Sequence, residues 1–166
     1  AAHAPHIRTI NGVRIAFLAY TALIPQSRDT ADASPAIAYL DTAAVRADIA
    51  AGKASADVVV IVLHWGNEYE PHPTAGQRDI ARELIAAGAT LVIGHHPHVI
   101  QDIEQVGEGL VAYSLGNFVF DQNFSPETAE GLALSVTLDA DGLIGWQELP
   151  IRFTPAFEPY LASTTP

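Results

Sequence analysis

The sequence predicts an α/β domain in which a strand–helix–strand unit is followed by mostly antiparallel strands. Two short apolar runs, residues 57–63 and 91–93, have the valine- and isoleucine-rich composition that is typical of buried parallel strands. Between them, residues 74–87 carry apolar side chains at helical spacing. A strand, a helix and a second strand in this order require parallel pairing of the two strands, and this unit therefore predicts the fold class.

The N-terminal region predicts a β-hairpin followed by a loop. Residues 7–10 and 13–20 flank the dipeptide Asn11-Gly12, which is preferred in two-residue type I′ turns. The second of these strands is mostly apolar and is expected to be buried. Prolines and polar residues then predict a loop over residues 21–34.

Helical spacing appears next over residues 41–51. Either Asp41 or Thr42 is suited to cap the start of this helix, and Gly52 is suited to its end.

The C-terminal third predicts strands. Four segments have strand composition: residues 110–114, 117–120, 132–138 and 143–150. Several of them alternate apolar and polar side chains, so we expect this part to be mostly antiparallel. Residues 154–166 contain three prolines and little periodicity. We therefore interpret residues 1–153 as a single domain and residues 154–166 as a proline-rich tail.

Charge and composition exclude several kinds of partner and site. The net charge of −11 argues against a nucleic-acid or anionic-membrane partner, because both require a basic surface. No apolar run approaches the roughly 18 residues of a membrane span, and no signal-peptide pattern is visible, so any membrane anchor is expected upstream. Because the chain has no cysteine, any metal must be bound by nitrogen and oxygen ligands.

Both buried strands lead directly to histidines. The first ends at His64, and the second is followed by His95, His96 and His98. Because parallel strands direct their carboxyl ends to one edge of a sheet, we expect His64, His96 and His98 to converge on a divalent metal ion. On an extended loop, the side chain of His95 would point away from them, which favours a packing or supporting role. Imidazole and oxygen ligands together suit manganese, iron or zinc.

Polar residues near these histidines are candidates for supporting roles. Glu68 could orient an imidazole or accept a proton, because ligating histidines usually donate their second N–H to an oxygen. Asp121 is as consistent with an exposed strand end as with a role in the site. For His3, His6 and His72 the simpler interpretation is an ordinary polar residue that binds no metal.

Three sequence blocks resemble the CapA/PgsA family of capsule biosynthesis proteins, which is linked to poly-γ-glutamate. They are HWGNEY at residues 64–69, GHHPH at residues 94–98 and YSLGNFVFDQ at residues 113–122. The resemblance runs from about residue 13 to residue 153. This family in turn is similar to the calcineurin-like metallophosphoesterases, which implies an α/β/β/α sandwich with a centre for two divalent metal ions.

The resemblance also implies roles for individual residues. By position, His64, His96 and His98 match metal ligands, whereas Glu68 matches a family block whose role the resemblance does not assign. If the protein is a hydrolase, His98 or Glu68 is the candidate for proton transfer. The residues expected around the pocket are Trp65, Gly66, His95, Asn117 and Asp121. The same fold takes further aspartate, asparagine and histidine ligands from upstream segments. This chain would therefore hold half of the site, and a missing N-terminal half or a partner chain would hold the rest.

Two functions are consistent with these residues. The first is a metal-dependent enzyme that hydrolyses or transfers a phosphate ester, in which the metal ions neutralise phosphate charge and activate water. The second is a non-catalytic metal- or polymer-binding component of a cell-surface assembly or export machine. Poly-γ-glutamate is anionic and would need bridging cations to bind an acidic chain. The resemblance implies a cell-surface or extracytoplasmic location for either.

Overall fold

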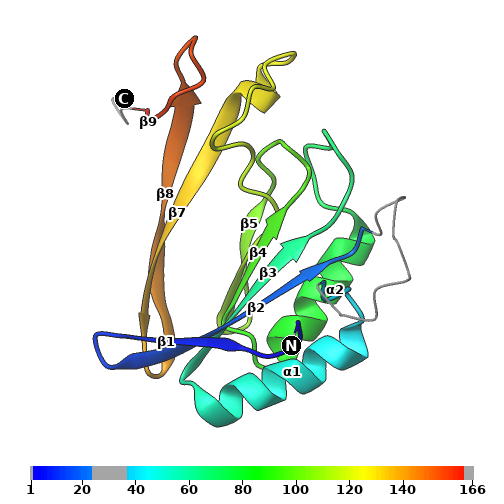
Figure 1. Cartoon of the computed structure of the whole chain (residues 1–166), viewed down its shortest axis with the longest axis vertical. Helices are drawn as coiled ribbons and strands as arrows, with labels where there is room; N and C mark the ends of the chain where they lie inside the picture. The colour runs from blue at the N-terminus through cyan, green and yellow to red at the C-terminus, as the bar shows by residue number, and fades with distance from the viewer. Residues whose placement is uncertain (1, 24–36, 163–166) are drawn as a thin grey trace.

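The computed structural model describes residues 2–23 and 37–162, which form three layers (Figure 1). A six-stranded sheet with the order β1-β2-β3-β4-β6-β5 lies in the middle. Helices α1 and α2 cover one of its faces, and a three-stranded sheet, β7-β8-β9, lies over the other. These layers confirm the predicted α/β class and correspond to the α/β/β part of the expected sandwich.

The elements have the following bounds: β1 His6–Ile10, β2 Val13–Thr21, α1 Thr42–Ser55, β3 Val58–His64, α2 Ala75–Ala86, β4 Leu91–His95, β5 Ile103–Val106, β6 Gly109–Ala112, β7 Glu130–Asp139, β8 Gly142–Phe153 and β9 Pro159–Leu161. A 3₁₀ turn, Glu127–Ala129, precedes β7. Neither α-helix within the described ranges is long and apolar enough to span a membrane.

The predicted hairpin is confirmed, since β1 and β2 pair in antiparallel fashion around the expected turn. Asn11 and Gly12 have φ angles of 51° and 88°, and a type I′ turn requires positive φ at both central residues. Most of the predicted loop over residues 21–34 lies outside the described residues. Where the chain resumes, Tyr39 forms a parallel bridge with Thr21 at the end of β2.

The strand–helix–strand unit is also confirmed, because β3 and β4 pair in parallel on either side of α2 in the sequence. The side-chain hydroxyl of Thr74 accepts a hydrogen bond from the backbone N–H of Gln77, at 3.2 Å. In return, the Gln77 side chain accepts one from the backbone N–H of Thr74, at 3.0 Å. This reciprocal capping box satisfies two N–H groups that a helix start leaves unpaired, and it fixes where α2 begins.

Helix α1 begins as predicted but ends later. The carboxylate of Asp41 accepts a hydrogen bond from the first turn, whereas the predicted stop at Gly52 is wrong, because the helix continues to Ser55. Gly52 is buried against the sheet, and a Cβ atom there would lie 3.3 Å from Val59 and 3.4 Å from Ala16. The glycine therefore permits close contact between helix and sheet.

The core has two parts, one on each face of the central sheet. On the helix side, buried side chains of α1 and α2 pack on those of the sheet: Val45, Ile49, Ala81 and Leu84 on Ala16, Val59, Ile61, Val92 and Val111. On the other side, side chains of β7 and β8 cover the sheet: Leu134, Val136, Leu138 and Leu143 pack on Val58, Val60, Leu91 and Leu110. Burial of each large apolar side chain contributes about 1.5–3 kcal/mol, so both faces stabilise the sheet on which the histidines sit.

Three predictions for the C-terminal third need correction. The predicted strand over residues 117–120 is absent, because the chain turns at Gly116, where φ is 69°, and leaves the sheet. Strand β5 was not predicted, and β6 pairs in parallel with β4 on its other side. The predicted tail over residues 154–166 includes a strand, β9, which pairs with β8. The long β7-β8 hairpin is antiparallel, as expected.

Candidate metal centre

The carboxyl ends of β3 and β4 bring the histidines to one edge of the sheet. His64 and His95 are direct partners at the ends of these parallel strands. The ring of His96 lies 4.7 Å from that of His64 and 6.1 Å from that of His98, measured between centroids. The structure therefore brings together the three imidazoles that the sequence assigned to a metal.

Glu68 joins two of these histidines in a group with the geometry of a cation site. One potential ligand atom from each of Glu68, His96 and His98 lies within 4.8 Å of the others. A carboxylate with two imidazoles is a donor set that suits manganese, iron or zinc. We call Glu68, His64, His96 and His98 the candidate metal centre.

The loop that carries these histidines has an unusual backbone. His96 and His98 have φ angles of 106° and 59°, in a region that side-chain-bearing residues rarely occupy. Tyr69, on the facing loop, has a φ of 64°, and its backbone N–H donates to the carbonyl oxygen of Pro97 at 2.8 Å. The assumption of an extended loop is therefore wrong, and contacts between the two loops hold the histidines in place. Strained backbone of this kind clusters at functional sites.

Below the histidine loop, Tyr113 and Trp65 pack so closely against Gly94 that no side chain would fit there. A Cβ atom at Gly94 would lie 1.9 Å from the carbonyl oxygen of Tyr113 and 2.3 Å from the indole nitrogen of Trp65. That nitrogen donates to the Tyr113 carbonyl at 3.1 Å, and the two rings stack 5.9 Å apart. Trp65 is 1% exposed. It lies in the core under the loop, which corrects the prediction that it lines the pocket.

Asn117 determines that Nδ1 of His98 carries a proton. The side-chain N–H of Asn117 donates to the backbone carbonyl of Thr128 at 2.9 Å, so the amide oxygen faces His98, whose Nδ1 lies 2.9 Å away. An amide oxygen can only accept, and Nδ1 must therefore carry the proton. The lone pair of His98 is then on Nε2, which is free to bind a metal. An outer hydrogen bond of this kind commonly orients a ligating histidine.

The electrostatic surroundings of His96 favour its neutral form. Burial lowers the pKa of His96, and the neighbouring His64 and His98 lower it further, while nearby Glu68 has the opposite effect. A histidine must be neutral to bind a metal through its ring nitrogen. His96 is therefore in a state that can ligate at neutral pH.

The remaining predicted pocket residues lie at the margin of the centre or outside it. The side chains of His95 and Asp121 are exposed, and neither belongs to the group of mutually close ligand atoms. Gly66 has a φ of 87°, and a Cβ atom there would lie 2.7 Å from the side chain of Gln77. This glycine allows the loop after β3 to pass close to α2.

Sequence reasoning missed an aromatic collar around His98, formed by Tyr69, Phe120 and Phe124. His98 stacks on Phe120 at 5.2 Å and on Tyr69 at 6.1 Å, and Tyr69 contacts Phe124 edge-on at 5.1 Å. All three rings are exposed, Phe124 to 66%. The signal available in the sequence was the close spacing of Phe118, Phe120 and Phe124 after Asn117. It also missed Thr21, whose hydroxyl lies 3.2 Å from Nδ1 of His64.

Solved structures with a similar arrangement show which fold the chain has. A 5′-nucleotidase precursor from Thermus thermophilus matches with a TM-score of 0.56 and 18% identity, over 93% of this chain and 31% of its own. A hypothetical protein from the same organism matches with a TM-score of 0.62 and 13% identity, over 89% of this chain and 61% of its own. At such low identities the likeness concerns the fold alone, which the chain shares with the 5′-nucleotidase precursor.

Sequence comparison then identifies the family. The bacterial capsule synthesis protein family PGA_cap matches residues 1–122, and the chain belongs to it. The PGA biosynthesis protein CapA of Bacillus subtilis (strain 168) is 36% identical over 142 residues, which are 86% of this chain and 37% of that protein. The capsule biosynthesis protein CapA of Bacillus anthracis is 35% identical over 122 residues, or 71% of this chain and 30% of that protein. The resemblance stated from the sequence is thus confirmed, and the chain spans about a third of the length of these relatives.

Proposed function

We propose that these residues form the histidine-bearing part of a divalent metal centre in a phosphate-ester hydrolase of the CapA type, acting in poly-γ-glutamate capsule formation at the cell surface. The observation that supports the proposal best is the convergence of Glu68, His96 and His98 within 4.8 Å, with His64 beside His96. Because the chain covers about a third of its relatives, the activity is proposed for the complete protein.

The side chains of the candidate metal centre are better suited to binding a transition-metal ion than to binding a phosphate group directly. The chain has a net charge of −11 and would offer an anionic substrate little attraction without a bound cation. His96, His98 and His64 would hold the ion through ring nitrogens, and Glu68 through a carboxylate oxygen. A bound divalent ion would supply positive charge for the phosphate and lower the pKa of water.

The hydrogen bond of Asn117 distinguishes the two candidates for proton transfer. Nδ1 of His98 is engaged with Asn117, so a His98 that also binds metal through Nε2 has no free nitrogen. The carboxylate of Glu68 is exposed and lies next to the histidines. A carboxylate has two oxygens, so Glu68 could hold the ion through one and accept a proton on the other. Glu68 is therefore the better candidate for accepting a proton, and His98 is a candidate for ligation alone.

Hydrolysis of an aryl phosphate by the full-length protein tests this proposal. After reconstitution with Mn²⁺, we expect the His96→Ala variant to lose both bound metal and activity. His72→Ala is the matched control, because the His72 side chain is 77% exposed and contacts Asp102, outside the centre. Equal rates for the wild-type and His96→Ala proteins would overturn the catalytic proposal.

The same experiment distinguishes the non-catalytic alternative. If metal binds and His96→Ala abolishes binding, yet no phosphate ester is cleaved, the centre binds metal without turnover. Calorimetric titration with polyglutamate, in the presence and absence of Mn²⁺, would then show whether the metal bridges the acidic protein to an acidic polymer.

A further inference from the structure

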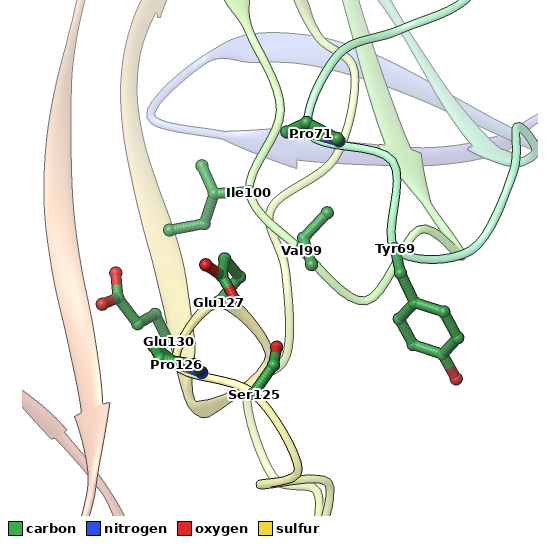
Figure 2. Close-up of a pocket in the computed structure, with 8 residues that line it drawn as sticks. All are labelled: Tyr69, Pro71, Val99, Ile100, Ser125, Pro126, Glu127 and Glu130. Carbon is green, nitrogen blue, oxygen red and sulfur yellow. The ribbon is translucent and has the colours of Figure 1, made fainter.

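A pocket of about 410 Å³ lies beside the candidate metal centre (Figure 2). Its lining residues are Tyr69, Pro71, Val99, Ile100, Ser125, Pro126, Glu127 and Glu130. Tyr69 connects the two sites, because it lines the pocket while its ring stacks on that of His98 at 6.1 Å. If a ligand binds at the histidines, a second chemical group of that ligand can therefore extend into this pocket.

The pocket has an apolar floor, with Tyr69 fixed at its edge. Figure 2 shows Val99 between Tyr69 and the segment that carries Ser125, and Ile100 beyond Val99 on the side away from Tyr69; Val99 is 4% exposed. Tyr69 is held at both ends: its backbone N–H bonds the carbonyl of Pro97 at 2.8 Å, and its hydroxyl accepts from the side chain of Gln122 at 3.0 Å. Its left-handed φ of 64° is therefore maintained by specific contacts.

The opposite side of the pocket is negatively charged. Glu127 accepts hydrogen bonds from its own backbone N–H and from Ser125, which lower the pKa of its carboxyl group and keep it ionised. Glu130 is paired with Arg152 at 2.7 Å, so the charge of Glu130 is balanced and Glu127 supplies the net negative charge on this side. The eight described lining residues include no lysine or arginine. The pocket is therefore suited to a cation and unfavourable for an anion.

We propose that this pocket binds the organic group of the substrate, and that this group carries an ammonium ion on an apolar body about the size of one ring. The substrate class is then a phosphate ester of an amine-bearing alcohol, an assignment that rests on the proposed phosphoesterase function. The volume is in the usual range for small-molecule sites. The carboxylate of Glu127 attracts an ammonium group, and the apolar floor packs against the body that carries it. A polyglutamate chain would be repelled at the same place.

Binding of small aromatic probes to the full-length protein tests the pocket without any metal. In the presence of a chelator, we expect benzylamine to bind more tightly than benzyl alcohol, and benzoate to bind least. Glu127→Gln should weaken benzylamine binding by about two- to fivefold and leave benzyl alcohol unchanged. Glu148→Gln removes the same charge from an exposed position on β8 and should change neither. Tyr69→Phe should preserve benzylamine binding, and Tyr69→Leu should reduce it.

A second measurement separates this inference from the proposed function. The Mn²⁺-loaded protein would be assayed with para-aminomethylphenyl and para-carboxyphenyl phosphates, and the ratio of kcat/KM for the two would be compared between wild type and Glu127→Gln. A ratio that falls in Glu127→Gln supports the inference. Binding of benzylamine that is no tighter than that of benzoate overturns it, whether or not the esters are cleaved. A Glu127-dependent preference for benzylamine without any hydrolysis supports the pocket chemistry and overturns the phosphoesterase function.

Discussion

Replacing Asn117 with alanine should weaken metal binding at His98 while the protein remains folded. The amide oxygen of Asn117 is the acceptor that holds the proton on Nδ1 of His98, at 2.9 Å. Loss of such an outer hydrogen bond typically lowers metal affinity by about 10- to 100-fold, which corresponds to about 1.4–2.8 kcal/mol. The variant also removes the donor to the carbonyl of the buried Thr128, at 2.9 Å. An unpaired buried carbonyl costs about 1–3 kcal/mol of stability.

Calorimetric titration of the full-length protein with Mn²⁺ measures the first effect, and thermal unfolding of the metal-free protein measures the second. Thr74→Ala separates them, because Thr74 caps α2 through Gln77 and lies outside the candidate metal centre. This control should lose about 1 kcal/mol of stability and keep its metal affinity. If folded Asn117→Ala binds Mn²⁺ as tightly as the wild type, then Asn117 does not orient His98 for ligation, and the reasoning is refuted.

Three further variants test the packing and charge of the fold. Gly94→Ala should prevent stable folding, because the new Cβ atom would lie 1.9 Å from the Tyr113 carbonyl; a melting temperature equal to that of the wild type would contradict this. Ile49→Ala should lower the free energy of unfolding in urea by about 2–5 kcal/mol, since Ile49 is fully buried on the face of α1 that packs on the sheet; a loss below 1 kcal/mol would mean that the site collapses around the cavity. Burial opposes the ionisation of Asp102, but the hydrogen bonds and charges of Arg78 and His72 together outweigh it and lower the pKa of the Asp102 carboxyl group. The Asp102 contribution to stability should therefore be complete above about pH 4 and should fade as the pH falls through the lower pKa of the folded state. In Asp102→Asn, the free energy of unfolding should therefore fall less steeply as the pH is lowered. An unchanged decrease would show that the ion pair of Asp102 and Arg78 contributes little to stability.

Local patterns predicted most of the elements. The helical spacing over residues 74–87 and the reciprocal pairing available to Thr74 and Gln77 specify α2, because a capping box depends on neighbours three positions apart. Asn11-Gly12 specified the hairpin in the same way, through the φ angles that its turn requires. Predictions failed where a local pattern had a long-range cause. Gly52 was predicted to end the first helix, but its lack of a side chain instead allows α1 to pack closely on the sheet.

The sequence by itself determined the class of the fold, the family and the edge of the sheet at which the histidines gather, because the carboxyl ends of parallel strands must lie together. Only the tertiary structure decided what each neighbouring side chain does. It buried Trp65 beneath the histidine loop, placed Asn117 against His98 and surrounded that imidazole with aromatic rings. These relations join residues up to 48 positions apart in the chain, and no local pattern encodes them, because they arise when separate loops fold against each other.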